Sequence, residues 1–200
     1  MIELAQQIIE DLNKTKVKIN KNIWEGSHFE GLKNMEIDTS GKVGEILLST
    51  FLESDNNVVF NGDSNTNAED GKYDMKVNNK RVEVKTARIG SGNTFQHEHL
   101  KNTDECDVYV FIDFEPNCFY ISIMNKDINF DDYVTERSGG KGYLHPIFEK
   151  SITHRKGEDN YKFDLSLSSL KKGLEKGMTI KIDTNDDNDD KIKIFLKKHL

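Results

Sequence analysis

The sequence is short of cysteine and proline, and both scarcities narrow the possible architectures. Its 200 residues include two cysteines, Cys106 and Cys118, and two prolines. No zinc motif uses the spacing of these cysteines, and so small a number leads us to expect a reducing, cytoplasmic environment. Two prolines argue against proline-rich linkers between domains.

Long hydrophobic runs are also missing. No segment approaches the roughly 20 apolar residues that a membrane helix needs. Residues 1–20 lack the apolar core of a signal peptide, so we expect no membrane partner. Hydrophobic residues make up 35% of the chain and charged residues 32%. This composition is polar but sufficient for a core, and the length suits one domain over residues 1–200.

The charge balance is acidic overall but uneven along the chain. A formal net charge of −7 argues against a nucleic-acid partner, because lysine and arginine drive phosphate binding. Much of the acid lies in residues 183–190, however. Residues 71–101 are rich in basic side chains, namely Lys72, Lys76, Lys80, Arg81, Lys85, Arg88 and Lys101. A locally basic surface beside carboxylates that hold a cation is compatible with DNA binding.

Hydrophobic periodicity predicts an α/β fold with a central mixed β-sheet flanked by helices. Residues 20–37 are expected to form a short helix or a loop packed on the core. Residues 191–198 are expected to form a final strand or helix. We expect helices at 2–13, 39–53, near 94–102 and at 166–176, the last capped by Ser166 or Ser168, and strands at 57–60, 73–77, 80–88, 107–114, 118–124 and 160–167, those at 107–114 and 118–124 being antiparallel.

The helix expected at 39–53 is apolar on two faces. Val43, Leu47 and Phe51 follow one helical stripe, and Leu48 shares the other face with Glu45. We therefore expect this helix to be buried on both sides. A carboxylate at position 45 then requires a partner.

Two short strands flank Asn78-Asn79, which predicts a two-residue hairpin turn because asparagine tolerates positive φ. This register places Asp74 directly opposite Glu83. One face of the hairpin is then wholly apolar and the other wholly charged. The apolar face carries Tyr73, Met75, Val77, Val82 and Val84, and the charged face Lys72, Asp74, Lys76, Arg81, Glu83 and Lys85.

Two opposed carboxylates raise one pKa or bind a cation. Mg²⁺ suits such a pair, since it prefers oxygen ligands and takes one or two carboxylates together with substrate phosphate. Lys85 lies on the same face as Glu83 and can reach a metal-bound water or the phosphate. The alternative is a surface hairpin on which Arg81 and Lys85 neutralise Asp74 and Glu83.

Asp74, eight intervening residues and Glu83-Val84-Lys85 resemble the PD-(D/E)xK nuclease superfamily, with Tyr73 in place of the proline. Glu45 on the preceding helix fits the same pattern. The stretch with Phe95-Gln96 is similar to type II restriction endonucleases, in which such a pair opens the helix after the E-x-K strand. The resemblance implies a restriction endonuclease-like core over about 39–124, with residues 125–200 serving DNA recognition, dimerisation or both.

The resemblance also implies roles for these residues. Asp74, Glu83 and the Val84 carbonyl would bind Mg²⁺, or Mn²⁺ in its place. Lys85 would orient or deprotonate the attacking water. Glu45 would hold a second metal, a metal-bound water or Lys85, and Gln96 would stand near the site. The implied activity is a Mg²⁺-dependent endonuclease that cuts double-stranded DNA at a specific site, acting as a homodimer.

Contacts to DNA are expected from the Gly/Ser/Asn stretch 90–93, from residues 125–170 and from nearby basic side chains. The candidates are Lys72, Arg88, Ser91, Asn93, Lys101, Lys141, Arg155 and Lys156. A junction-resolving or repair nuclease of the same fold is one alternative. A non-catalytic acidic protein that mimics DNA is another, favoured by the net charge.

Two further segments resemble metal-binding motifs but depart from them. The loop from Asp63 departs from the EF-hand pattern, with Ala68 at the glycine position and Asp74 at the final glutamate position. His97-Glu98-His99 lacks the His-Glu-x-x-His zinc spacing, so we expect these residues on a helix surface or facing DNA.

Overall fold

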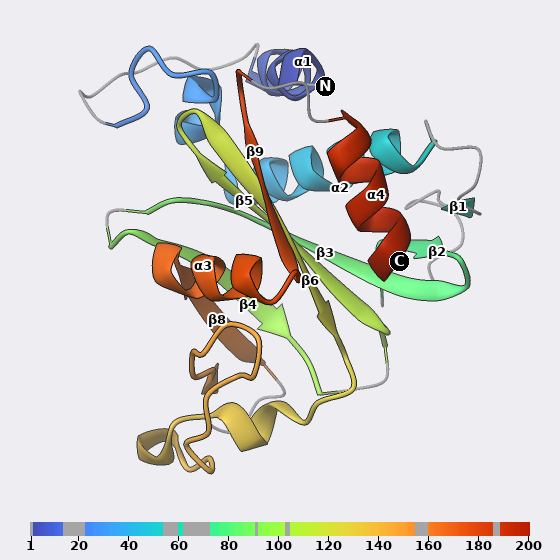
Figure 1. Ribbon diagram of the computed structural model, residues 1–200. Coiled ribbons are helices and arrows are strands. Elements are labelled where there is room, and N and C mark those ends of the chain that lie inside the picture. The colour runs from blue at the N-terminus through green and yellow to red at the C-terminus, as the bar shows by residue number, and fades with distance from the viewer. Residues whose placement is uncertain are drawn as a thin grey trace.

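The computed structural model describes residues 2–13, 23–53, 60–61, 73–90, 92–102, 105–154, 160–185 and 189–200. This part of the chain is a mixed α/β structure in which two sheets carry helices (Figure 1). Its α-helices are α1 (Ile2–Asn13), α2 (Ile37–Glu53), α3 (Leu167–Glu175) and α4 (Asp189–His199). Short 3-10 helices are η1 (Glu30–Asn34), η3 (Phe130–Tyr133) and η4 (Glu136–Ser138). Among the helices described, none has the length and apolarity required to span a membrane.

The larger sheet has six strands in the order β1-β2-β3-β5-β6-β9. Strands β3 and β5 pair in parallel and all other neighbours are antiparallel. Side chains 108–114 and 118–124 are all buried, which explains why both segments read as continuous apolar runs. The strands are β1 (Phe60–Asn61), β2 (Met75–Val77), β3 (Lys80–Arg88), β5 (Val108–Glu115), β6 (Cys118–Asn125) and β9 (Thr179–Asp183).

The smaller sheet has the order β4-β8-β7, formed by Thr94–Leu100, Tyr161–Ser166 and Thr153–His154. The helix predicted near 94–102 is therefore wrong, because this segment is strand β4. Phe95 and His97 point inward while Gln96 and Glu98 are exposed, an alternation typical of a strand with one buried face. The sequence predicted the order helix, strand, hairpin, helix and strand. The structure differs from this order because a strand replaces the second helix.

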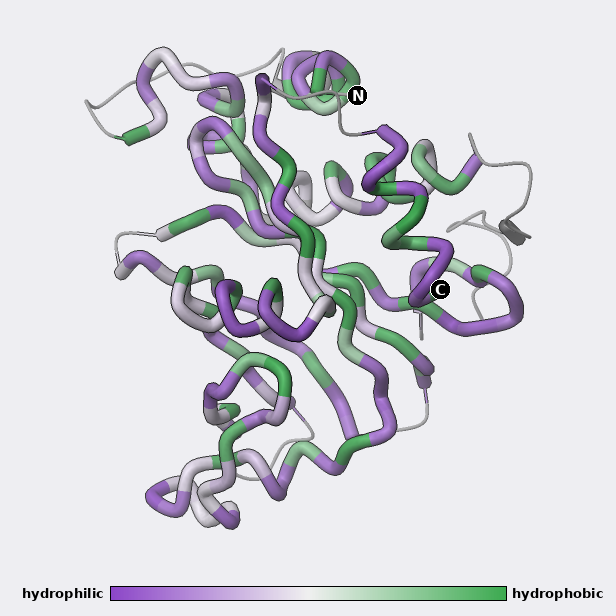
Figure 2. Tube along the Cα trace, viewed as in Figure 1, coloured by the Kyte–Doolittle hydropathy of each residue, from purple (hydrophilic) through white to green (hydrophobic). Residues whose placement is uncertain are grey.

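Helix α2 lies against β3 at a point where only glycine fits. A Cβ atom on Gly44 would stand 2.0 Å from the Thr86 hydroxyl oxygen. Both predicted faces of this helix are buried, with Val43, Leu47 and Leu48 at 0% exposure. Figure 2 shows hydrophobic residues along the central strands and mixed character on α3 and α4. Helix α2 thus forms a fixed layer on one face of β3.

Most other expected elements are confirmed. Residues 2–13 are helix α1, and the strands expected at 107–114 and 118–124 are antiparallel neighbours. Ser166 caps α3 by accepting a hydrogen bond from the Ser169 amide, and 191–198 falls in helix α4. Within residues 20–37, four apolar residues pack on the core, namely Trp24, Phe29, Leu32 and Met35, whereas Ile23 is exposed. The loop from Asp63 lies outside the described residues.

Candidate active site

The β2–β3 hairpin turns at the predicted asparagines. Asn78 and Asn79 have φ of 48° and 68°, the positive values of a two-residue hairpin turn whose twist matches its strands. The register is confirmed, since Met75 pairs with Val82 and Val77 with Lys80. The predicted apolar face is buried throughout, comprising Tyr73, Met75, Val77, Val82 and Val84.

Asp74 lies where the β2 ladder stops. Its amide donates to the Val82 carbonyl over 3.0 Å, and its Oδ2 accepts a hydrogen bond from the Val84 amide over 2.7 Å. Continuing the register would pair Val84 with Tyr73. The Asp74 carboxylate therefore occupies the acceptor position of a backbone carbonyl, and the expected direct pairing of Asp74 with Glu83 falls beyond the ladder's end.

This hydrogen bond also fixes where the Val84 carbonyl points. In a β-strand the N–H and C=O of one residue face the same edge. Because the Val84 N–H meets Asp74, its carbonyl oxygen faces that edge as well. The structure thus directs the Asp74 carboxylate and the Val84 main-chain oxygen towards one region.

The electrostatics of Asp74 are strongly perturbed. Burial, together with the nearby negative charge of Glu83, raises the pKa of Asp74 from 3.8 to about 7, and Glu45 contributes in the same direction. The Val84 hydrogen bond and Lys85 oppose this rise without cancelling it. Three carboxylates from α2, the β2 end and β3 therefore interact around Asp74, an arrangement that a divalent cation would neutralise.

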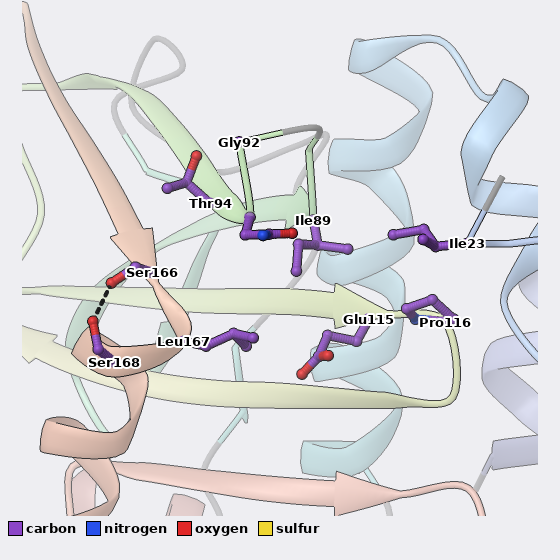
Figure 3. A pocket seen from close by; sticks show the side chains of 10 residues that line it. Ile23, Ile89, Gly92, Thr94, Glu115, Pro116, Ser166, Leu167 and Ser168 are labelled. Atoms are coloured by element: carbon purple, nitrogen blue, oxygen red, sulfur yellow. Dashed lines mark hydrogen bonds between the residues drawn. The ribbon is translucent and has the colours of Figure 1, made fainter.

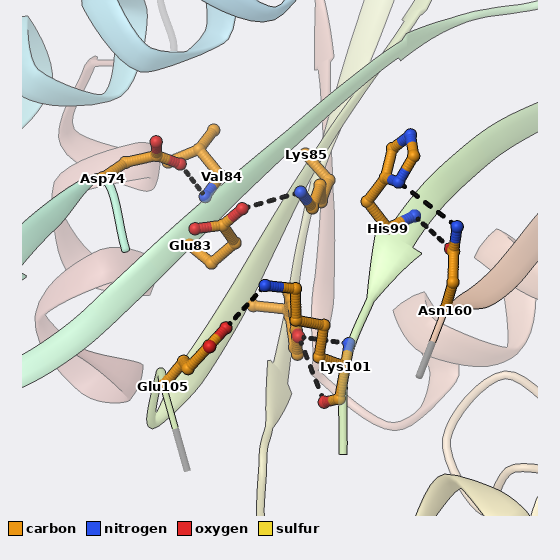
Figure 4. A network of polar contacts seen from close by, with 9 residues as sticks. Asp74, Glu83, Val84, Lys85, His99, Lys101, Glu105 and Asn160 are labelled. Atoms are coloured by element: carbon orange, nitrogen blue, oxygen red, sulfur yellow. Dashed lines mark hydrogen bonds and ion pairs between the residues drawn. The ribbon is translucent and has the colours of Figure 1, made fainter. Parts of the chain in front are cut away.

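Lys85 lies beside Glu83, as the sequence predicted. Its ammonium is 2.6 Å from Glu83 Oε1, and both side chains are 19% exposed (Figure 4). Glu45 instead forms an ion pair with Lys42 on its own helix at 2.8 Å. The structure thus places a partly buried ammonium next to the acidic group, with a second lysine at its helical edge.

The donor set fits Mg²⁺. In the described part of the chain, no three Asp, Glu, His or Cys side chains gather closely enough to form a complete metal site by themselves. Mg²⁺ does not require one, since it keeps several waters and typically takes one or two carboxylates together with substrate phosphate. Asp74, Glu83 and the Val84 carbonyl supply oxygen ligands of this kind.

Gln96 is not brought to this group. It pairs with Asp164 across β4 and β8 and is exposed, whereas its neighbours Phe95 and His97 are buried. Because His97 packs on Phe111 of the larger sheet, Gln96 points away from that sheet. The expectation that Gln96 stands near the site is wrong, since it assumed a helix where the chain forms a strand.

His97 also departs from expectation, because it is 2% exposed rather than on the surface. Its Nε2 lies 2.9 Å from Asp113 Oδ1 on β5, and both side chains are fully buried. Burial raises the pKa of Asp113, and the neighbouring His97 opposes that rise. This pair joins the two sheets. Alternation along 94–100 was the sequence signal that could have revealed it.

The expected DNA contacts separate into several groups. Arg88 donates from Nη1 to the carbonyls of Leu32 in η1 and of Met35 at its end, which ties β3 to η1. Lys101 lies near Glu83 and Lys85 (Figure 4) and pairs with Glu105 at 2.9 Å. Four of the candidates lie outside the described residues: Lys72, Ser91, Arg155 and Lys156.

Two further candidates lie in loops. Lys141 is exposed and pairs with Asp132 at 2.7 Å. Asn93 has a φ of 52° in the turn before β4 and lines a cavity of about 570 Å³ (Figure 3). This cavity extends from Ile89 to the start of α3 at Leu167. It adjoins the far end of β3, away from the turn that precedes Glu83 and Lys85.

Comparison with models of protein families, with curated proteins and with solved structures found no match to this chain. The function must therefore be argued from the geometry of the site.

Proposed function

We propose that the protein is a Mg²⁺-dependent endonuclease that hydrolyses phosphodiester bonds in duplex DNA. One observation carries the proposal. The Asp74 carboxylate is held on the Val84 amide and has a pKa raised to about 7 by burial and by Glu83. Lys85 lies 2.6 Å from Glu83 in the same group. Acids forced together beside an ammonium are typical of sites that bind a cation and an anionic substrate.

Each residue then has a chemical role. Asp74, Glu83 and the Val84 carbonyl would hold Mg²⁺, which supplies Lewis-acid polarisation of the phosphate when bound. Lys85 steadies a non-bridging phosphate oxygen and orients the attacking water. The water forms a new P–O bond as the bond to the leaving sugar oxygen breaks in line with it. The proton lost by the water passes to solvent, and the leaving oxygen is protonated.

Glu45 supports this chemistry from α2. Its negative charge contributes to the raised pKa of Asp74. Its ion pair with Lys42, at 2.8 Å, holds the carboxylate with its side chain 20% exposed. We propose that Glu45 binds a metal-bound water, a second metal ion or Lys85 once substrate is present.

The finer proposal is a type II restriction endonuclease that cuts at a specific site as a homodimer. Its support is the D-x₈-ExK pattern, with Glu45 upstream. A junction-resolving or repair nuclease would use the same chemistry on branched or damaged DNA. A non-catalytic DNA mimic would display its carboxylates on the surface, whereas Asp74 is partly buried and tied to a backbone amide.

Incubation with supercoiled plasmid and Mg²⁺ tests the proposal. The wild-type chain should nick or linearise the plasmid, and Asp74→Asn should not. Lys171→Ala, an exposed change on α3, serves as the matched control and should cut normally. Sequencing the ends then separates a defined duplex site from cleavage at junctions or lesions. No cleavage of plasmid, cruciform or nicked substrates by a folded preparation would refute the enzyme proposal.

A further inference from the structure

Strand β4 contains an irregularity close to the candidate site. His97 pairs with Phe163 and Leu100 with Tyr161, so β4 advances three residues while β8 advances two. The extra residue makes a β-bulge, and His99 has a φ of 60°. Few non-glycine residues adopt this left-handed conformation. Bulges next to functional sites commonly redirect a side chain, and here the side chain at the bulge is that of His99.

Asn160, immediately before β8, holds His99 by two contacts. The His99 amide donates to Asn160 Oδ1 over 3.1 Å, and Asn160 Nδ2 lies 3.3 Å from His99 Nδ1 (Figure 4). A backbone N–H can only donate, so the asparagine atom that meets it is the carbonyl oxygen. The remaining NH₂ group donates to Nδ1. Neutral His99 must therefore carry its proton on Nε2.

His99 stands on the rim of the candidate active site. It precedes Lys101 by two residues, about 7 Å along a strand. The Lys101 amide donates to the Tyr109 hydroxyl over 3.0 Å, and Tyr109 is the β5 neighbour of Glu83. In the view of Figure 4, Glu83 lies on one side of Lys85, and His99 with Asn160 lies on the other, beside β4. The exposed imidazole thus lies on the β4 side of the candidate active site.

We propose that His99 is a substrate-positioning residue that donates its Nε2–H to a non-bridging oxygen of the DNA backbone, on a phosphate adjoining the cleaved bond. This inference rests on the proposed function and adds a contact to it. The bulge sets the direction of the ring, and Asn160 sets its tautomer. A phosphate oxygen is the acceptor expected beside a strand already held by Lys85.

If His99 served only the fold, replacing it would change the stability of the protein and not its cleavage rate. The proposal predicts the reverse. Glycine or asparagine would adopt the positive φ with less strain than histidine. His99→Gly and His99→Asn should therefore leave the urea midpoint of unfolding unchanged or raised. Both should lower the cleavage rate at subsaturating DNA about 10- to 100-fold, the usual effect of losing one hydrogen bond to a charged group.

The variant Asn160→Asp tests the proposed hydrogen bond through the pH dependence of cleavage, which a purely structural role of His99 would leave unchanged. A carboxylate at position 160 accepts from Nδ1–H, so the neutral ring would lose its proton on Nε2. The imidazolium keeps both protons. The rate of cleavage by Asn160→Asp, relative to wild type, should therefore be lower in alkaline than in acidic solution.

His28 provides a matched control, because it is an exposed histidine whose amide and Nδ1 both lie 3.1 Å from Asn117 Oδ1. His28→Asn and Asn117→Asp should leave the rate and the pH profile unchanged. Equal cleavage by His99→Gly and wild type would overturn the inference while leaving the proposed function intact. A change in which sites are cut would also overturn it, since it would show a contact to a base. Absence of cleavage by the wild-type chain would refute both proposals together.

Discussion

The backbone amide of Val84 donates to Asp74 Oδ2 over 2.7 Å, at the point where the β2–β3 ladder would otherwise continue. A side-chain carboxylate thus replaces a main-chain acceptor and is fixed in place by the hairpin itself. The same contact orients the Val84 carbonyl towards Asp74. The position of the Asp74 carboxylate in the candidate site therefore follows from the end of β2 at Met75.

Replacing Asp74 by asparagine should stabilise the protein in alkaline solution. The folded pKa, about 7, lies above the ordinary value of 3.8, so between these pH values the folded state binds the extra proton. Stability therefore falls as the pH rises through this window and the deficit persists above it. We expect Asp74→Asn to raise the free energy of unfolding by about 1–3 kcal/mol at pH 8 and by little at pH 4.

Urea unfolding at both pH values, without divalent metal, provides the measurement. Asp183→Asn is a suitable control, because Asp183 pairs with Lys181 at 2.7 Å on the edge strand β9 and its side chain is 45% exposed. An identical effect of Asp74→Asn at the two pH values would contradict the assigned titration.

Binding of Mg²⁺ should strengthen with pH for the same reason. The ion must displace the proton that Asp74 retains below about pH 7. Affinity measured by calorimetry should therefore rise about tenfold for each pH unit below that value and level off above it. Asp74→Asn should abolish the tight component, whereas a pH-independent affinity would show that the ion binds elsewhere.

Lys85→Ala should separate catalysis from binding. The ammonium lies 2.6 Å from the Glu83 carboxylate. In the proposed mechanism it would be one of several cations that contribute to DNA affinity, so its removal should weaken binding only slightly. We expect cleavage to fall by about 10²–10³-fold, the range for removing one group that stabilises charge in the transition state. Fluorescence anisotropy with a labelled duplex should show a change in dissociation constant below about tenfold. Retained cleavage would remove Lys85 from the mechanism.

Arg88→Ala should destabilise the fold. Its guanidinium bonds the carbonyls of Leu32 and Met35, and burial lowers its pKa. Loss of these charge-assisted bonds should reduce the free energy of unfolding by about 2–3 kcal/mol. A stable Arg88→Ala variant with weakened DNA binding would restore the DNA-contact role that the sequence suggested.

The hairpin was predictable because its signals are local. Alternation of side chains on both arms and two asparagines between them fix the register. The carboxylates and lysine at positions 74, 83 and 85 could therefore be grouped from sequence. The residue at which β2 ends could not be predicted, because no residue pattern marks it. At that end the amide of Asp74 donates to the Val82 carbonyl.

Other parts depended on distant partners. The segment 94–100 resembled a helix opening, yet β8, some sixty residues later, supplies a strand partner and makes it a strand. That pairing buries His97, exposes Gln96 and produces the bulge at His99. Strand β9, which pairs with β6, was missed although the β-branched alternation of residues 179–183 is a strand signal.

The link between β3 and β5 carries one more consequence. These parallel neighbours are joined through β4, which pairs with β8 and not with either of them. A fragment ending after β6 would leave β4 without its partner and would uncover Phe95 and Phe111, both at 0% exposure. The acidic centre and the later part of the chain are therefore expected to fold as one unit, because the strand that links β3 to β5 takes its partner from residues 161–166.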